Sequence, residues 1–329
     1  MARLRMARLA ASLLALAALV AAGKPPWPTG LPVPSRPAGE RAVPPAIEQA
    51  RVELGRRLFY DADLSRDGTM ACATCHEQKH AFADGNRTHP GVTGERGRRN
   101  VPGLANVRWI APLTFADPTQ VTLEAQVAVP VFGTHPVEMG MKGLEGEITT
   151  RLGHDDCYVR QFRRAFPGDG GRIDPANMAR AVAAFERTLV SFGSAFDRGA
   201  LSPDARKGRA VFARACAGCH AGPLFTDRAY HRLDPADPAA PDQGLFEATG
   251  RAGDRARFRT PSLRNVLLTG PWLHDGSAGT IEEAIRRHRQ PVTPPDMAML
   301  VAFLGALSDP AFTTRADLAM PYKACGRAL

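Results

Sequence analysis

The feature that most constrains this chain is a five-residue pattern that occurs twice, as Cys72-Ala-Thr-Cys75-His76 and as Cys216-Ala-Gly-Cys219-His220. In this pattern the two thiols form thioether bonds to a haem, and the histidine becomes an axial ligand of the iron. A zinc site would need a further pair of ligands at close spacing, and a redox dithiol has no use for the terminal histidine. We therefore predict two covalently bound haem c groups. Their attachment and ligand residues are Cys72, Cys75, His76, Cys216, Cys219 and His220.

Length and motif spacing set the expected domain organisation. The 329 residues leave room for two domains of ordinary size, and the motifs lie far enough apart for one haem in each. We predict a mainly α fold with two cytochrome c-like haem domains and long loops. The N-terminal domain covers residues 46–197 and the C-terminal domain residues 198–329, with a C-terminal tail that can pack back on the first domain.

Local patterns predict several helices. Apolar residues recur at helical spacing from Ile47 to Leu58, ahead of the first haem motif. Asp174 followed by Pro175 is typical of a helix start, and Thr280-Ile-Glu-Glu283 is a capping box that opens a short helix over residues 281–290. A last apolar helix is expected over residues 295–307. No run alternates well enough to predict a sheet.

Residues 1–23 have the features of a secretory signal: three early arginines, an apolar run, and small residues at 20–22. The run is shorter than the ~20 apolar residues that a membrane span needs, so we expect none after cleavage. A Pro-rich leader follows at residues 24–45. We predict a periplasmic protein, where Cys157 and Cys325 could either pair or stay separate.

The net charge of +9 gives little support for nucleic-acid binding. Loss of the three signal arginines and gain of up to four haem propionates would leave roughly +2. The arginine pairs are scattered and lack interleaved aromatic residues, so we expect no nucleic-acid partner.

The residue opposite each axial histidine decides what its iron can do. His288 lies on the same predicted helix face as Ile281 and Ile285, so it either ligates an iron or is hydrogen-bonded in the core. Gln126 and Glu138 are candidates to orient peroxide and shuttle its proton above an open iron.

Several further motifs, taken with these, resemble the bacterial di-haem cytochrome c peroxidases and their MauG-like relatives from about Val43 to Phe303. They are Leu54-Gly-Arg-Arg-Leu-Phe-Tyr60, Ala81-Phe-Ala-Asp-Gly85, Arg99-Asn-Val-Pro102, Leu123-Glu-Ala-Gln126, Pro136-Val-Glu-Met139, Phe258-Arg-Thr-Pro-Ser-Leu-Arg-Asn265 and His274-Asp-Gly-Ser277. The spacing from Pro130 to Met139 is most similar to that of the MbnH-like subgroup, whose members modify a partner protein.

The resemblance implies a peroxidatic haem on His76, with Gln126 and Glu138 on its open side and Pro130 keeping the pocket apolar. It implies a six-coordinate electron-transfer haem on His220. The distal ligand of that haem falls at His288, where the peroxidases carry Met and MauG carries Tyr. It also implies one calcium ion, with ligands from Asn100, Thr260 and Pro261.

Two departures from the family pattern bear on electron transfer. Ligation by His288 instead of Met would lower the potential of the second haem. Phe115 lies where relatives carry an inter-haem Trp, and Trp109 is the alternative relay, although ordinary loop packing also accounts for it. Some relatives have a loop histidine that ligates the first haem at rest. His89 and His80 are the candidates here, and we expect neither to contact iron.

The expected function is peroxide reduction at the first haem, with electrons relayed through the second from a small cytochrome c or a cupredoxin. One alternative is MauG-like oxidation of a side chain, such as Trp, on a protein substrate. A non-catalytic di-haem electron carrier is a second alternative, but a carrier has no use for Gln126 and Glu138 above an open iron.

Overall fold

The computed structural model of the protein describes residue 31, residues 43–235 and residues 237–328. The described residues from 43 onward belong to one compact unit. The predicted signal peptide and almost all of the predicted leader lie outside the described residues. Among the described residues, no helix is long and apolar enough to cross a membrane.

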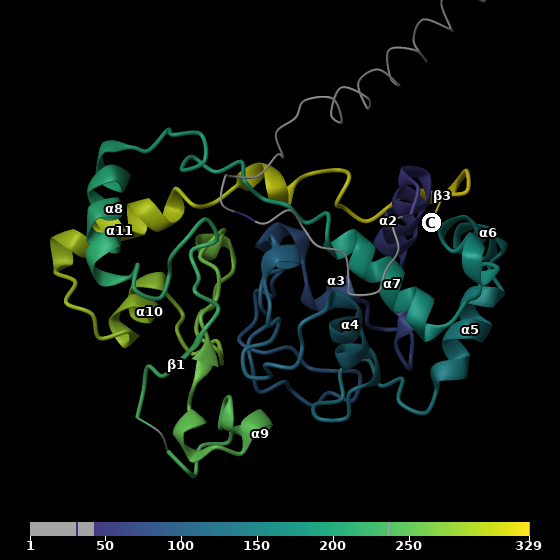
Figure 1. The fold of residues 1–329 in the computed structure, drawn as a ribbon, viewed down its shortest axis with the longest axis horizontal. Helices are drawn as coiled ribbons and strands as arrows, with labels where there is room; N and C mark the ends of the chain where they lie inside the picture. Colours follow the sequence, from purple (N-terminus) through teal and green to yellow (C-terminus); the bar gives the residue numbers. More distant parts are fainter. Residues whose placement is uncertain (1–30, 32–42, 236, 329) are drawn as a thin grey trace, which may run out of the picture. The chain divides into compact units, whose positions relative to one another are not determined.

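The described chain is mainly helical, as predicted, with short strands and long connecting segments (Figure 1). Its α-helices are α2 (Pro45–Phe59), α3 (Cys72–Cys75), α4 (Leu123–Phe132), α5 (Glu145–Gly153), α6 (Asp156–Ala165), α7 (Pro175–Glu186), α8 (Pro203–Ala215), α9 (Phe246–Thr249), α10 (Ile281–Arg287) and α11 (Pro294–Gly305). The strands form two antiparallel pairs, β1 (Tyr230–His231) with β2 (Phe258–Arg259) and β3 (Lys323–Ala324) with β4 (Arg327–Ala328).

The helix starts predicted at Pro175 and Thr280 are confirmed, but two predicted ends are too late: the helix expected over residues 295–307 is α11, Pro294–Gly305. The Asp174 side chain accepts from the backbone N–H of Asn177 at 2.8 Å, and Pro175 occupies the first turn of α7. The helix predicted over residues 281–290 ends at Arg287. Arg289 has a φ of 55°, so the backbone leaves the helical region before the proline that was expected to end the helix.

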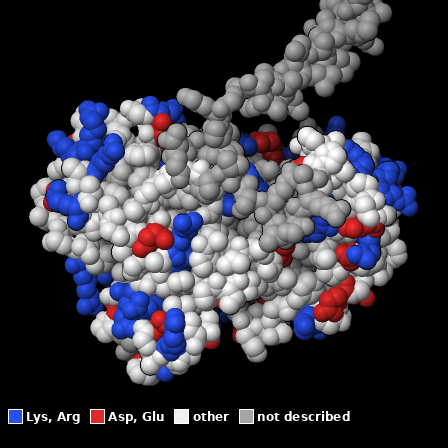
Figure 2. All heavy atoms as spheres, in the orientation of Figure 1, with Lys and Arg blue, Asp and Glu red and all other residues white. Residues whose placement is uncertain are grey.

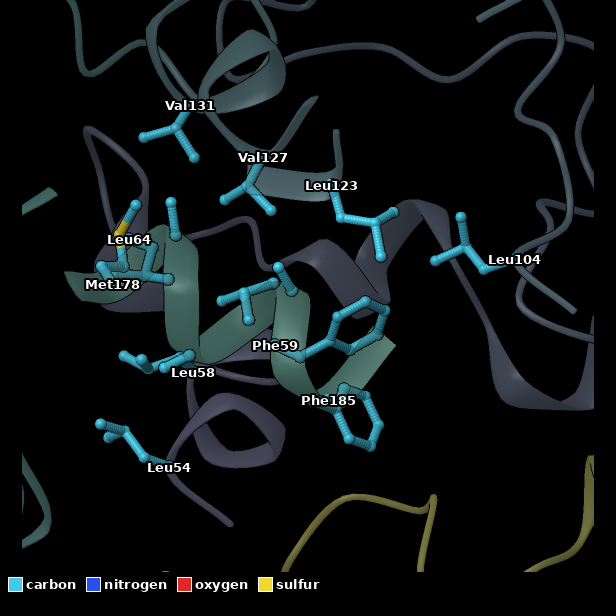
Figure 3. Close-up of a cluster of buried hydrophobic side chains, with 14 of the residues drawn as sticks. Leu54, Leu58, Phe59, Leu64, Leu104, Leu123, Val127, Val131, Met178 and Phe185 are labelled. Atoms are coloured by element: carbon cyan, nitrogen blue, oxygen red, sulfur yellow. The ribbon is translucent and has the colours of Figure 1, made fainter. Parts of the chain in front are cut away.

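The core of the first half forms where α2 packs on α6 and α7 (Figures 1 and 3). Leu54, Leu58 and Phe59 are fully buried there, each contributing about 1.5–3 kcal/mol by burial. Gly55 permits the close approach of the helices, because a Cβ at this position would lie 1.8 Å from the carbonyl oxygen of Ala181. The periodic apolar positions seen in the sequence are therefore the packing face of α2.

In the second half, α8 and α11 pack together with α10 beside α11 (Figure 1). Gly208 again permits the contact, because a Cβ there would lie 1.8 Å from the carbonyl oxygen of Met299. Phe212 and Phe303 meet across this contact with ring centroids 5.1 Å apart. Each haem motif is thus preceded by a helix that is fixed to the core through a glycine contact.

A buried hydrogen-bond network joins the two halves. Asn106 and Ser191 exchange two hydrogen bonds, of 3.0 Å and 2.9 Å. The Asn265 amide donates to Oγ of Ser191 at 3.0 Å, and its Oδ1 accepts from the backbone N–H of Asp309 at 2.8 Å. Asn106 and Asn265 both have a φ of 62° and each begins a 3-10 turn, so the two halves repeat this local structure. The limits of the two domains at residues 197 and 198 stay a prediction.

The C-terminal segment packs on α2. The Tyr60 hydroxyl donates to the carbonyl oxygen of Leu318 at 2.8 Å, and Leu318 is fully buried in the core of the first half. Cys157 of α6 and Cys325 form a disulfide. The choice between paired and separate thiols, which the sequence left open, is therefore settled by the fold.

We expect Cys157→Ser to lower the free energy of unfolding by about 2–5 kcal/mol, because the disulfide spans 168 residues and restricts the unfolded chain. The measurement is the denaturant midpoint, followed by far-UV circular dichroism. Cys325→Ser and the double variant should lower the free energy of unfolding by the same amount as Cys157→Ser. Unchanged midpoints in all three would contradict a stabilising role.

Candidate functional site

Each predicted haem motif folds into one tight turn. The backbone N–H of His76 donates to the carbonyl oxygen of Cys72, and that of His220 donates to Cys216, both at 2.9 Å. Within the described part of the chain, the four motif cysteines stay outside disulfides, unlike Cys157. Two thiols and one imidazole are therefore presented together at each site, as covalent haem attachment requires.

A backbone carbonyl orients each motif histidine. Nδ1 of His76 lies 2.8 Å from the carbonyl oxygen of Phe82, and Nδ1 of His220 lies 3.1 Å from that of Phe225. Both phenylalanines have a positive φ, 62° and 54°, which is strained for a bulky residue. Since a carbonyl only accepts, each Nδ1 carries the proton and each Nε2 keeps a lone pair for a metal.

Burial also keeps these imidazoles neutral. Burial is the largest effect on both imidazoles. It lowers the pKa of His76, and it lowers the pKa of His220 to about 4. A metal binds the neutral imidazole, so no proton has to be displaced at neutral pH. The donor set at both motifs therefore fits a haem iron.

His288 faces His220 across a gap of the width that an iron needs. Their ring centroids lie 6.3 Å apart. Two metal–nitrogen bonds of about 2 Å, with about 1 Å from each nitrogen to its ring centre, add up to about 6 Å. Nδ1 of His288 lies 2.7 Å from the carbonyl oxygen of Ala284, which leaves Nε2 available. The pair fits the two axial positions of one haem.

The helices α4 and α10 begin with the same local structure. The Thr122 hydroxyl caps α4 and the Thr280 hydroxyl caps α10, each accepting a backbone N–H three residues on. Eight residues after these caps stand Pro130 in α4 and His288 at the end of α10. Equivalent positions thus carry an imidazole in one half and, in the other, a proline side chain with no ligating atom. The sequence signal was the repeated Thr-x-Glu at each helix start.

An apolar stripe fixes the orientation of α4. It packs into the cluster that contains Phe59 and Phe185 (Figure 3). Its members, spaced four residues apart, are Leu123, Val127 and Val131. Gln126 precedes Val127 and Pro130 precedes Val131, so both lie on the neighbouring stripe of the helix.

Glu138 comes to the first haem motif from the segment that follows α4. The backbone N–H of Met139 donates to the carbonyl oxygen of Pro130 at 2.9 Å and holds this segment on the helix. Burial raises the pKa of Glu138. Burial and the Glu138 charge together raise the pKa of the Cys75 thiol to about 12, so this carboxyl lies beside the motif. Oε1 of Gln126 is buried and has no hydrogen-bond partner among the described residues.

Comparisons with known proteins agree with this arrangement. The sequence profile of a family described as "Di-haem cytochrome c peroxidase" matches residues 49–205. "Methylamine utilization protein MauG" of Methylorubrum extorquens is 35% identical over 243 residues, which cover 71% of this chain and 67% of that protein. "Cytochrome c551 peroxidase" of Pseudomonas aeruginosa is 33% identical over 295 residues, covering 84% and 83%. The chain belongs to the di-haem cytochrome c peroxidase and MauG family.

A solved structure supports the same family. The crystal structure of "a MauG-like protein associated with microbial copper homeostasis" superposes with a TM-score of 0.84 at 32% identity, covering 92% of this chain and 100% of that one. The protein is therefore an oxidoreductase of the cytochrome c peroxidase family. Membership implies two haem c groups and hydrogen peroxide as the substrate.

The two loop histidines have other neighbours. Nδ1 of His89 lies 2.7 Å from Oδ2 of Asp84, a carboxylate that is fully buried. The His80 ring lies against Gly85, where a Cβ would come within 2.9 Å of Nε2. His89 is thus paired with a carboxylate, as a structural loop histidine would be.

Two of the predicted calcium ligands, Asn100 and Thr260, make hydrogen bonds within the protein. The Asn100 amide nitrogen donates to the carbonyl oxygens of Asn86 and Arg87, both at 3.2 Å. The Thr260 carbonyl accepts from Oγ1 of Thr226 at 2.7 Å and from Nη1 of Arg259 at 3.1 Å, which uses both of its lone pairs. The calcium ion and its ligands Asn100, Thr260 and Pro261 stay predictions from the resemblance.

Both candidate relay residues contact the second half of the chain. Trp109 is buried against Phe192, with ring centroids 5.7 Å apart, and its carbonyl oxygen accepts from Arg228 at 3.4 Å. The Phe115 carbonyl accepts from the backbone N–H of Arg259 at 2.8 Å, and the Arg259 guanidinium lies 6.0 Å from the Phe115 ring. Both residues therefore lie where the two halves of the chain meet, and their role as an electron relay stays a prediction.

Proposed function

We propose that this protein is a periplasmic di-haem peroxidase that reduces hydrogen peroxide at the haem on His76, with electrons relayed through the haem on His220. The observation that carries the proposal is the difference between two equivalent helix positions. His288 stands opposite His220, whereas the equivalent position in α4 is Pro130, whose side chain offers no ligand. One iron is then closed for electron transfer and the other is left open for peroxide.

In this proposal the chain's residues divide the work at the first haem. Bound haem supplies an iron that exchanges electrons with peroxide. Pro130 keeps water and competing ligands away, and the Gln126 amide orients the peroxide by a hydrogen bond. The Glu138 carboxylate accepts the proton of one peroxide oxygen and returns it to the other, which turns that oxygen into a leaving water.

A second candidate function is MauG-like oxidation of a side chain on a partner protein. The paired imidazoles of His220 and His288 favour it, because two nitrogen ligands lower the potential and help both haems to share oxidising equivalents. Trp109 at the junction favours it too, while Phe115 disfavours it because Phe is much harder to oxidise. The similarity to MauG and to the MauG-like structure is consistent with either function.

The proposed donor for peroxide reduction is a small cytochrome c or a cupredoxin. Basic and acidic side chains are interspersed over the face shown in Figure 2. Such a mixed surface suits a transient protein partner better than a nucleic acid. Calcium, if bound, would involve Asn100.

The test adds peroxide to the holoprotein with reduced cytochrome c, and separately with candidate partner proteins. Peroxide-dependent oxidation of the cytochrome supports the peroxidase. A peroxide-dependent mass change in a partner tryptophan, without turnover of the cytochrome, supports the alternative. If the ferric protein has no high-spin, five-coordinate signal before or after partial reduction, the protein is a non-catalytic di-haem electron carrier.

A further inference from the structure

One buried acid near the first haem motif has no role in the mechanism above. Glu186 is the last residue of α7, which packs against α4, the helix that carries Gln126. Oε2 of Glu186 is buried and has no hydrogen-bond partner among the described residues. A buried carboxyl oxygen without a partner costs free energy, so a purely structural position would be expected to pair it or replace it. Such groups are typical of functional sites.

The neighbouring cation does not neutralise Glu186. Nη2 of Arg187 binds both carboxylate oxygens of Glu124, at 2.7 Å and 2.9 Å. Side chains of this ion pair are 20% and 22% exposed, so the pair reaches solvent while it flanks the buried carboxyl. Glu186 therefore lies beside a cation, Arg187, that is already paired with the carboxylate of Glu124.

The charges around Glu186 favour its protonated form. Burial is the largest effect; Arg187 opposes it and Glu124 adds to it, so that the pKa of Glu186 rises to about 8. Glu186 in turn adds to the effect of burial in raising the pKa of the Cys72 thiol, so its carboxyl lies beside the attachment point of the first haem. The charged or titratable neighbours are thus Cys72 on α3, Glu124 on α4 and Arg187 directly after α7.

We propose that Glu186 is a proton donor of the first haem pocket, which delivers to peroxide a proton taken from solvent at the Glu124–Arg187 pair. The inference rests on the proposed function. Reduction of one peroxide breaks the oxygen–oxygen bond and consumes two electrons and two protons, giving two waters. The donor protein supplies the electrons. Glu138 only moves the proton that peroxide brings, whereas Glu186 gives up its own and is reprotonated from solvent.

This assignment separates two carboxyls by their environment. An acid and a base in one site need different protonation states at the same pH. The buried Oε2 of Glu186 has no hydrogen-bond partner in the part of the chain that the structure describes, and this favours the neutral carboxyl. The pKa of Glu138 is also raised, but the nearby His89 acts against the rise. The proposed pair is thus a protonated Glu186 and an ionised Glu138.

The first test reads the proton directly in the resting ferric holoprotein, without turnover. We expect a carboxylic C=O band in the infrared spectrum that disappears as pH rises through about 8 and is missing in Glu186→Gln. Glu95→Gln, at an exposed position, should keep the band. A band that is absent from the wild type, or present in Glu186→Gln, overturns the proposal while leaving peroxide reduction itself untouched.

The second test measures peroxide turnover. We expect Glu186→Gln to lower kcat by about 10²-fold, the lower end of what a positioned general acid contributes, with an unchanged optical spectrum of both haems. Wild-type activity should fall as pH rises through about 8, and Glu124→Gln should move this fall to lower pH because it removes a negative neighbour. Glu124→Gln also keeps the proposal testable if Glu186→Gln does not fold.

The possible results are distinguishable. Unchanged turnover in Glu186→Gln, with the infrared band lost, would mean that Glu186 is protonated but delivers no proton, and the proposal fails. No peroxide turnover in the wild type, with the band present, would overturn the proposed function and with it the proton delivery.

Discussion

Glu138→Gln is expected to lower the rate of peroxide reduction by about 10²–10⁴-fold, the range that a positioned acid–base group contributes. Glutamine keeps the size of the side chain and its hydrogen-bonding capacity, but it cannot accept and return a proton. The Met139 backbone bond to Pro130 should hold the segment in place in the variant. The loss should therefore be in kcat and not in folding or haem content.

The pH dependence follows from the direction of the pKa shift. Burial raises the pKa of Glu138 above its ordinary 4.5, and the proton shuttle needs the ionised form. Activity should therefore fall as pH drops, with an apparent pKa above 4.5, and Glu138→Gln should lack this acid limb. Glu95→Gln, at an exposed position, is the matched control. Stopped-flow measurement of peroxide decay between pH 4 and pH 9 gives both results.

Retention of the acid limb in Glu138→Gln would assign it to another group. A rate within about threefold of the wild type would remove Glu138 from the mechanism.

His288→Met is expected to raise the reduction potential of the second haem and to change its low-spin optical spectrum. The thioether is a weaker donor to ferric iron than an imidazole, and axial ligands adjust haem potentials over a range of about 0.8 V. Spectroelectrochemical titration of the holoprotein measures the shift. The first haem should keep its potential, since His288 faces only His220 at 6.3 Å.

His288→Ala is the matched variant that supplies no ligand. We expect it to leave the second iron five-coordinate, giving a second high-spin signal in the ferric protein by electron paramagnetic resonance. His154→Met, at an exposed position, should change neither potential nor spectrum. An unchanged spectrum in both His288 variants would show that another residue closes the second haem.

The sequence by itself determined the covalent chemistry and the helix starts. Both haem motifs place two thiols and an imidazole within one turn, so adjacency in the chain is enough to predict them. The Asp174-Pro175 and Thr280 signals depend only on local hydrogen bonds, and both were confirmed. The end of α10 was predicted too late, because Arg289 leaves the helical region before the proline.

The tertiary structure decided what stands around each haem motif. The pairing of Cys157 with Cys325 needs the C-terminal segment to return to α6 across 168 residues. The partnerless oxygen of Glu186 becomes apparent only when α7 packs on α4 and Arg187 is taken by Glu124. Burial and charge at a carboxyl depend on side chains that are distant in the sequence. A chain pattern can therefore identify a haem, but only the packed helices set the pKa of the acids beside it.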